Sequence, residues 1–290
     1  NFIIRGFGNG ANNAGIEPSV GVFIDGVYRS RTAAQISDLP NVSRIEVLRG
    51  PQSTLFGKNA SAGIISIVTE EPSFTTRGLA ELSYGNYDAL VGKGYISGPV
   101  SDSLALSLAA GFNRRDGYNV DPASDSTTNE RDRWFVRGQA LYDNGSNLSF
   151  RLIADYDRIN ENCCGVVNVQ PSAFTQALQA VGGQVNPAND PFGNLVYNNF
   201  PSLNDVENYG VSGQLDFDVT DNVTLTSITA YRETSGEFEQ DVDFTSAALL
   251  ERYNQQKLET FTQELRATGQ FGPVTALAGL FYFDESVRED

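Results

Sequence analysis

The sequence predicts an all-β protein in which a small globular domain, residues 1–72, precedes antiparallel strands of a transmembrane β-barrel, residues 73–290. Three observations predict this fold class. From about Arg77 onward, segments of about ten residues alternate apolar and polar side chains, which suits a tilted strand that crosses a membrane. No apolar run approaches the roughly 18 residues that a transmembrane helix needs. Tight and long connections also alternate along the chain, as they do in transmembrane barrels.

The first 72 residues combine short apolar strands with connections rich in Gly and Asn, such as GFGNGANNAG at residues 6–15. This composition is typical of a compact domain with extended loops. The segment EPS, residues 71–73, is the expected linker to the barrel. The chain opens directly on a strand and shows no signal peptide, so we expect it to be an interior piece of a longer protein.

The barrel strands should present one apolar face to lipid. In LALSLAAGF, residues 104–112, one face carries Leu104, Leu106, Leu108, Ala110 and Phe112, and the other carries Ser107 and Gly111. In VSGQLDFDV, the expected outward residues are Val211, Gly213, Leu215, Phe217 and Val219, and the opposite face carries Ser212, Gln214, Asp216 and Asp218. Carboxylates would therefore line the interior. A soluble sandwich also alternates, but the loops at its two ends do not differ systematically in length.

The lengths of the connections predict which strand ends lie together. Tight connections are expected at residues 98–102, 143–147, 220–222 and 271–273, and long ones at 117–131, 159–208 and 239–255. This pattern gives nine strands, with the short turns at the periplasmic rim. Pro171 and Gly182 should bracket a short helix in the longest loop. Tyrosines near strand ends suit an interfacial girdle, although Tyr is also common in strands generally: Tyr84, Tyr87, Tyr95, Tyr142, Tyr156 and Tyr231.

Charge and residue types exclude several function classes. The chain has 20 basic and 36 acidic residues, a net charge of −16, which would repel a nucleic acid. It contains no His, so a Ser-His-Asp triad is impossible and a zinc site is improbable. We therefore expect neither an enzyme nor a bound cofactor or metal. The adjacent Cys163 and Cys164 would form a vicinal disulfide in an oxidising location.

The chain contains IIRGFG at residues 3–8, VFIDGVY at residues 22–28 and RIEVLRGPQSTLFG at residues 44–57. In this order, these three motifs resemble those of TonB-dependent outer-membrane receptors of Gram-negative bacteria. The segment RIEVLRGPQSTLFG, residues 44–57, resembles the end of the plug domain of that family. The family positions are filled here by Glu46, Arg49, Gly50, Pro51, Ser53, Leu55, Phe56 and Gly57. Upstream, IIRGFG at residues 3–8 and VFIDGVY at residues 22–28 resemble two earlier plug strands. The resemblance implies the C-terminal part of a plug followed by about nine strands of a barrel of about 22.

The resemblance also implies site residues. Family positions that contact the substrate from the outward plug loops correspond to Arg5, Tyr28, Arg29 and Ser30. Guanidinium groups suit the anionic periphery of a ferric chelate, but an ion pair with a lumen carboxylate is an equal interpretation for Arg5. Asn9, Asn12 and Asn13 would bind a ligand or form turns. Glu46 and Arg49 are expected to anchor the plug to the wall of the barrel.

The implied function is active uptake of a scarce, bulky nutrient, foremost a ferric siderophore, across the outer membrane. The implied partners are TonB with its inner-membrane energising complex, the ferric chelate, and outer-membrane lipid and lipopolysaccharide. Carbohydrate and cobalamin receptors share the same plug motifs and remain alternatives. A passive porin-like barrel is a further alternative, but it would need no plug.

Overall fold

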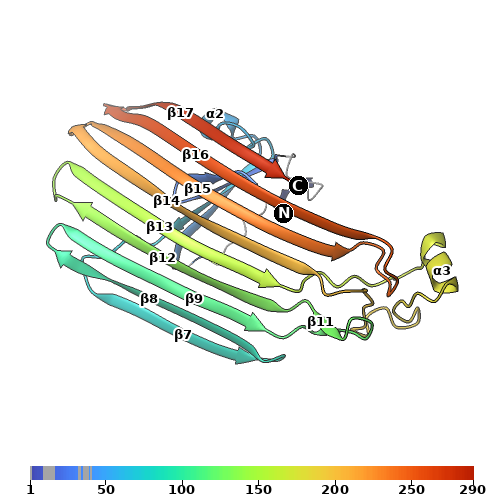
Figure 1. The fold of residues 1–290 in the computed structure, drawn as a ribbon. Helices are drawn as coiled ribbons and strands as arrows, with labels where there is room; N and C mark the ends of the chain where they lie inside the picture. The colour runs from blue at the N-terminus through green and yellow to red at the C-terminus, as the bar shows by residue number, and fades with distance from the viewer. Residues whose placement is uncertain (1, 9–16, 32–33, 35–38, 40) are drawn as a thin grey trace.

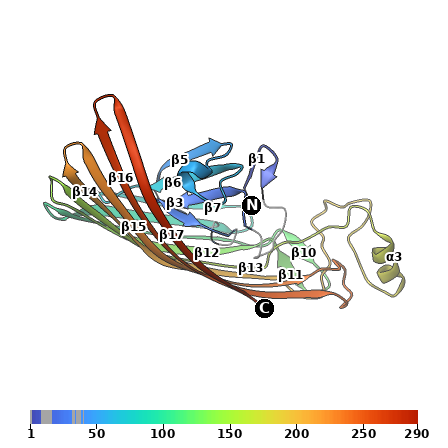
Figure 2. The ribbon, with the colours of Figure 1, turned by 90° about the horizontal axis from the view of Figure 1, so that it is seen from above.

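The computed structural model describes residues 2–8, 17–31, 34, 39 and 41–290. Two sheets dominate it. A large curved sheet, here called the wall, carries a small sheet on its concave side, as Figures 1 and 2 show. Thus the predicted division into a globular part and a row of long antiparallel strands is visible in the described residues.

The wall consists of nine antiparallel strands within the described residues. They are β7 (Arg77–Gly85), β8 (Ala89–Ser101), β9 (Leu104–Arg115), β12 (Arg131–Asp143), β13 (Leu148–Glu161), β14 (Leu203–Thr220), β15 (Val223–Asp241), β16 (Glu251–Phe271) and β17 (Val274–Glu289). The order β7-β8-β9-β12-β13-β14-β15-β16-β17 makes each of them pair with its neighbour along the wall (Figure 1). The prediction of nine strands is confirmed.

The alternation of side chains sets the two faces of the wall. On β9, Leu106 and Leu108 are 45% and 52% exposed, whereas Ala105 and Ala109 are buried. On β14, Val211 is likewise exposed on the convex face. The predicted outward faces of these two strands are therefore confirmed, because a period of two leaves every second side chain on the same face.

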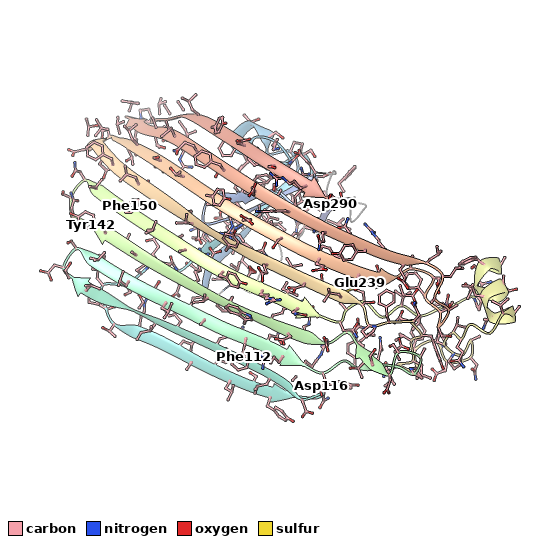
Figure 3. All side chains as sticks on the ribbon, in the orientation of Figure 1. Phe112, Asp116, Tyr142, Phe150, Glu239 and Asp290 are labelled. Carbon is pink, nitrogen blue, oxygen red and sulfur yellow. A yellow bond between two sulfur atoms is a disulfide. The ribbon has the colours of Figure 1, made fainter. Side chains whose placement is uncertain are left out.

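Aromatic side chains mark the two borders of an apolar band on the convex face. Trp134 and Tyr142 lie eight residues apart on β12 and are both exposed, which separates them by about 26 Å along the strand. The apolar band of an outer-membrane barrel is about 25 Å tall. Figure 3 shows Tyr142 and Phe150 near one border and Phe112 near the other. One girdle prediction is wrong: Tyr95 is buried on the concave face with Ala109 and Phe135, because it occupies an inward position of β8.

The two ends of the wall differ as predicted from β8 onward, but the predicted alternation is wrong at its start, because only residues 86–88 join β7 to β8 at the end that carries the long loops. The turns that join β8 to β9, β12 to β13, β14 to β15 and β16 to β17 are short, and they lie together at the turn end. The opposite loop end carries a long connection with the hairpin β10 (Asn119–Asp121) and β11 (Ser126–Thr128), which the sequence did not predict. The strands also extend further than predicted, because β14 begins at Leu203 and β16 at Glu251, inside the expected loops.

Two short helices are described. Helix α3 (Ala173–Ala180) lies in the longest loop, and the Ser172 hydroxyl accepts a hydrogen bond from the Thr175 amide at 3.1 Å. The predicted helix between Pro171 and Gly182 is confirmed. Helix α2 (Ser53–Phe56) spans a single turn. In the part of the chain that the structure describes, no helix has the length and apolar character needed to cross a membrane.

Two of the three N-terminal motifs, at residues 22–28 and 44–57, contribute strands to the small sheet. Its strands are β3 (Val20–Ile24), β4 (Val27–Arg29), β5 (Val42–Arg49) and β6 (Gly63–Thr69), in the order β4-β3-β6-β5, and β1 (Ile3–Ile4) with β2 (Phe7–Gly8) forms a separate hairpin. Asp25 and Gly26 connect β3 to β4 with φ of 48° and 77°. Positive φ at both central residues is the geometry of a tight hairpin turn, for which Asp-Gly is a favoured sequence.

Candidate functional site

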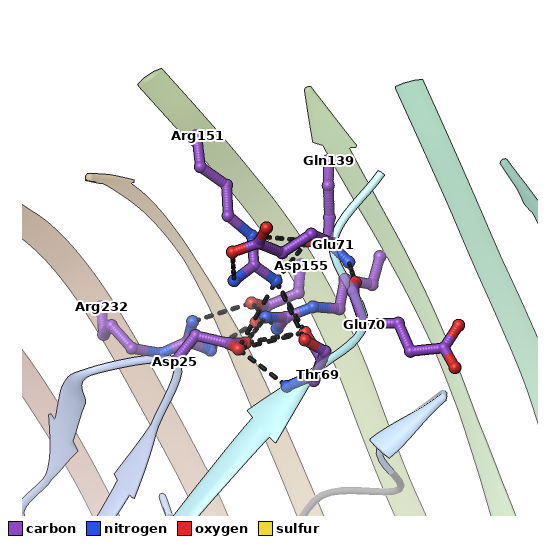
Figure 4. A network of polar contacts seen from close by, with 9 residues as sticks. Asp25, Thr69, Glu70, Glu71, Gln139, Arg151, Asp155 and Arg232 are labelled. Atoms are coloured by element: carbon purple, nitrogen blue, oxygen red, sulfur yellow. Dashed lines mark hydrogen bonds and ion pairs between the residues drawn. The ribbon is translucent and has the colours of Figure 1, made fainter. Parts of the chain in front are cut away.

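The candidate site is the polar contact between the β3–β4 turn and the wall, which Figure 4 shows from close by. The tight turn directs the Asp25 side chain toward the concave face of the wall, where it is 3% exposed. Its carboxylate forms an ion pair with Arg137 of β12 and lies 3.5 Å from the guanidinium of Arg151 of β13. It also accepts a hydrogen bond from the Thr69 amide at 2.8 Å, so one carboxylate joins the turn, the end of β6 and two wall strands.

The arginine of β12 is shared with a second carboxylate. The Arg137 Nη1 donates to Asp155 on β13 at 2.9 Å. Arg232 of β15 donates to both oxygens of Asp155, at 3.0 and 2.6 Å. A buried charge is tolerated when it is paired and hydrogen-bonded, because desolvation of an unpaired charge is costly. This network therefore holds the turn against three strands of the wall through charges that satisfy one another.

The segment that leads into the wall is held by the same strands. Arg151 donates to the Thr69 hydroxyl at 3.0 Å and to the Gln139 side-chain oxygen at 2.7 Å. Gln139 in turn donates to the Glu70 carbonyl at 3.1 Å. Glu71 lies 3.6 Å from Arg151. The linker predicted at residues 71–73 thus begins at a fixed point on β12 and β13.

Apolar and charged contacts continue this interface toward β17. Val27 packs against Ile228 and Ala230 of β15. The ring centroids of Tyr28 and of Phe283 on β17 lie 5.9 Å apart. Arg31 donates to Glu285 of β17 at 2.8 Å. The interface therefore runs from β12 to β17 across the concave face.

Burial and hydrogen bonding shift the pKa values of three side chains in the first 31 residues. Desolvation raises the pKa of the Tyr28 phenol, whose oxygen accepts a hydrogen bond from Asn59 at 2.7 Å. Desolvation likewise lowers the pKa of the Arg29 guanidinium. The hydrogen bond from Lys58 lowers the pKa of the Glu17 carboxyl. Asp25, Arg137, Arg151, Asp155 and Arg232 meet as complementary charges in a site that is shielded from water.

Comparison with known proteins gives this interface its context. Residues 1–64 match the family model described as the TonB-dependent Receptor Plug Domain. The chain is 39% identical over 110 residues to the pesticin receptor of Yersinia enterocolitica serotype O:8, a match that covers 38% of this chain and 16% of that protein. The chain belongs to the TonB-dependent receptor family. Its place is accordingly the outer membrane.

Other relatives of this receptor family support the same fold. The chain is 30% identical over 176 residues to the Vitamin B12 transporter BtuB of Vibrio vulnificus, which covers 57% of this chain and 28% of that protein. The ferric yersiniabactin uptake receptor FyuA from Yersinia pestis matches with a TM-score of 0.70 at 23% identity, over 94% of this chain and 40% of that chain. The siderophore receptor PiuA from Acinetobacter baumannii matches with a TM-score of 0.72 at 16% identity, over 98% and 41%. This chain thus spans less than a third of these curated relatives and about two fifths of the solved receptors.

Within this TonB-dependent receptor, the small sheet is the plug, and the predicted substrate residues take different positions in it. Tyr28, Arg29 and Ser30 are 5%, 6% and 3% exposed, between the plug and the wall. Arg5 lies in the turn between β1 and β2 with a φ of 53° and is exposed. Asn9, Asn12 and Asn13 lie outside the described residues. The four described residues therefore do not form one exposed surface, and the role of all seven in binding stays a prediction.

The residues expected to anchor the plug lie on the strand farthest from β4 in the small sheet. Glu46 pairs with Arg44 at 3.0 Å on the same strand, and Arg49 pairs with Gly63 of β6 in the backbone register. Polar contacts with the wall strands are described for Asp25, Thr69, Glu70, Glu71 and Arg31. An anchoring role of Glu46 and Arg49 stays a prediction. Asp25 was not among the predicted site residues. An available signal was that Arg137 and Arg151 occupy inward positions of strands whose outward positions are apolar.

The two cysteines lie at the loop end. Cys163 and Cys164 form a disulfide. The Asn129 side-chain oxygen accepts hydrogen bonds from the amides of Cys164 and Gly165, at 3.0 and 3.3 Å. The disulfide-bearing segment is thereby attached to the connection that follows β11. Among the described residues, no group of three or more His, Cys, Asp or Glu side chains is arranged to hold a metal ion.

Proposed function

We propose that this chain is the plug part, residues 1–72, and the first wall part, residues 73–290, of a receptor that takes up a ferric siderophore by TonB-linked energy. The proteins that this chain resembles support this proposal, since they include a ferric yersiniabactin uptake receptor and a siderophore receptor. The nine strands would belong to a larger closed barrel. The apolar convex band would contact outer-membrane lipid and lipopolysaccharide.

The observation that carries the proposal is the Asp25 network. A passive porin keeps an aqueous channel open, whereas here a folded domain lies on the inner face of the wall and is held there by buried ion pairs. Such a domain blocks passage until its contacts break. The arrangement favours a gated transporter, and the proposed transport involves no covalent chemistry.

The geometry suggests which contacts would break during transport. Release of the β3–β4 turn requires Asp25 to leave Arg137 and Arg151, while Arg137 can keep Asp155 as a partner. The hydrogen bond from Gln139 to the Glu70 carbonyl can persist, because the linker stays attached to the wall. The wall charges thus remain partly paired when the turn departs, which lowers the cost of opening. Energy from the inner-membrane complex through TonB would drive the separation.

An uptake experiment tests the proposal. Cells with and without the gene for the whole receptor are given a radiolabelled ferric siderophore, before and after the proton-motive force is collapsed. We expect gene-dependent uptake that disappears with the gradient. Gene-dependent uptake that persists without the gradient would indicate a passive channel, and uptake independent of the gene would contradict the iron assignment.

A second candidate is uptake of cobalamin. It is favoured by the 30% identity to a Vitamin B12 transporter over 57% of this chain. A carbohydrate receptor would share the same plug motifs. The uptake experiment separates these candidates when labelled cobalamin and labelled oligosaccharide are supplied in parallel with the ferric siderophore.

A further inference from the structure

A second ion pair joins plug and wall at some distance from the Asp25 network. Arg31 follows β4 of the plug, and its Nη2 donates to the Glu285 carboxylate of β17 at 2.8 Å. The two side chains are only 14% and 6% exposed. Glu285 shares the concave face of β17 with Phe283, which contacts Tyr28 of the plug. The pair therefore lies inside the wall, between the two domains.

This ion pair uses only part of the hydrogen-bonding capacity of the Arg31 and Glu285 side chains. Arginine and carboxylate commonly pair through two parallel hydrogen bonds. Here Nε and Nη1 of Arg31 and one oxygen of Glu285 are buried without a hydrogen-bond partner among the described residues. Buried donors without acceptors are unfavourable. A ligand that brings oxygen acceptors to Arg31 would remove that penalty.

The surrounding charges balance each other. Glu17 lies 3.8 Å from Arg31 and accepts a hydrogen bond from Lys58 at 2.8 Å. Two bases and two acids thus form the row Lys58, Glu17, Arg31 and Glu285. Because their charges cancel, an anionic ligand can bind the Arg31 guanidinium only in competition with the Glu285 carboxylate.

An aromatic cluster lies in the same part of the interface. The Lys58 ammonium lies 4.0 Å from the centroid of the Phe283 ring, and the Tyr28 ring packs against the other rings of this cluster. Aromatic faces and cations together suit a flat, oxygen-rich anion such as a catecholate or phenolate, which offers both a ring and negative oxygens.

We propose that Arg31 is a ligand-binding residue that an anionic iron chelate shares with Glu285. The chelate would accept hydrogen bonds from Nε and Nη1 of Arg31. This would weaken the hydrogen bond from Arg31 to Glu285 and so loosen the plug from β17. The inference rests on the proposed siderophore function. It assigns a role to Arg31 and Glu285, which lie beyond the predicted residues Tyr28, Arg29 and Ser30.

Binding measurements on the whole receptor in detergent test this proposal. The probe is a ferric tris-catecholate complex, which is anionic, and its affinity is measured by calorimetry. E285Q removes the competing charge and should bind the complex roughly tenfold more tightly, whereas R31Q should bind it roughly tenfold more weakly. R31K keeps the charge without the planar fork and should fall between R31Q and the wild type.

Matched controls carry the same charge changes on other surfaces. R114Q alters an exposed arginine at the loop end of β9, and E237Q alters a partly exposed glutamate of β15 that accepts a hydrogen bond from Tyr253. Neither should change the affinity. A ligand-independent loosening of the plug would shift E285Q and R31Q in the same direction, and this would overturn the proposal. Normal binding by all variants would overturn it as well.

The same experiment separates the inference from the function on which it rests. If the wild-type receptor binds neither the ferric tris-catecholate nor a neutral ferric trihydroxamate, the siderophore function itself fails. If the wild type binds and the two variants do not differ from it, only the role of Arg31 and Glu285 fails. Should R31Q lose the amide protection of β3 and β6, E285Q and R31K still decide the outcome.

Discussion

Asp25 and Arg137 lie 112 positions apart in the sequence and form an ion pair in which the side chains are 3% and 4% exposed. The carboxylate comes from a tight turn of the plug and the guanidinium from the middle of a wall strand. Because both charges are buried, the pair depends on the correct docking of the two domains. It is therefore a sensitive point for mutation.

Replacement of this carboxylate should loosen the plug. Asp25→Asn removes the charge that faces Arg137 and Arg151, although Arg137 keeps Asp155. We expect the free energy of local opening of β3, β4 and β6 to fall by about 3 kcal/mol, since removal of one partner leaves buried charge uncompensated. Native-state amide exchange of the whole receptor measures this change.

The control for this variant is Glu46→Gln. It breaks an ion pair of the same plug whose side chains are 59% and 47% exposed. An exposed pair contributes little, so the opening free energy should change by less than about 1 kcal/mol. Equal effects of the two substitutions would show that the Asp25 network does not hold the plug.

The turn that carries Asp25 should tolerate only glycine at its second position. Gly26 has a φ of 77°, and an added Cβ would lie 3.0 Å from the Ile228 side chain of the wall. Gly26→Ala should therefore destabilise the docked plug by roughly 1–2 kcal/mol, through strain and crowding. Gly94→Ala on β8 is the matched control, because a Cβ there meets nothing within 4 Å. Thermal unfolding of the plug, followed by amide exchange, compares the two, and an unchanged G26A would refute the close approach.

The apolar band on the convex face predicts a depth-dependent cost for charge. Leu108 is 52% exposed within the band, whereas Val219 lies beside the short turn after β14. Leu108→Arg should destabilise the bilayer-inserted receptor by about 2–4 kcal/mol and Val219→Arg by about 1 kcal/mol or less. Folding into lipid vesicles at graded urea concentrations measures both. Equal costs at the two positions would contradict the assignment of the band to the membrane.

The disulfide should stabilise the loop end alone. Cys163 and Cys164 are joined, and the segment is held to the residue after β11 by the Asn129 side chain. In a variant with both cysteines replaced by Ser, amide exchange should quicken in residues 116–130 and 162–202. The plug strands, which contact the wall elsewhere, should keep their protection. Faster exchange in β3 or β6 would show that the disulfide affects the plug as well.

The sequence predicted the wall well because its pattern is local. Alternation along residues 104–112 is enough to place Leu106 and Leu108 outward, and loop lengths are enough to sort the strand ends. The prediction for Tyr95 was wrong because it rested on the position of Tyr95 near a strand end. The alternation along β8 places Tyr95 on the same inward face as Ser97 and as Ala109, its partner on β9. Strand β14 is longer than predicted because it begins at Leu203, in a mostly polar stretch that shows no apolar alternation.

The site could be predicted only in part. The alternation of apolar and polar residues along β12 and β13 predicts that Arg137 and Arg151 face inward, but it does not predict which plug residue contacts them. Asp25 lies in a motif whose Asp-Gly pair has a sufficient local explanation as a turn, so its second role stayed hidden. Partner choice across such sequence separations depends on how the two domains dock, which no local pattern records.

A reversible cross-link between plug and wall tests the central claim most directly. Val27 and Ile228 are buried in contact, so Val27→Cys with Ile228→Cys, in a receptor whose Cys163 and Cys164 are Ser, can join β4 to β15. Energised uptake of a ferric siderophore is measured before and after oxidation, with binding as the control. We predict that oxidation abolishes uptake and preserves binding, and that a reductant restores transport. If the oxidised receptor took up the siderophore as fast as the reduced receptor, the claim that the plug must leave the wall would be contradicted.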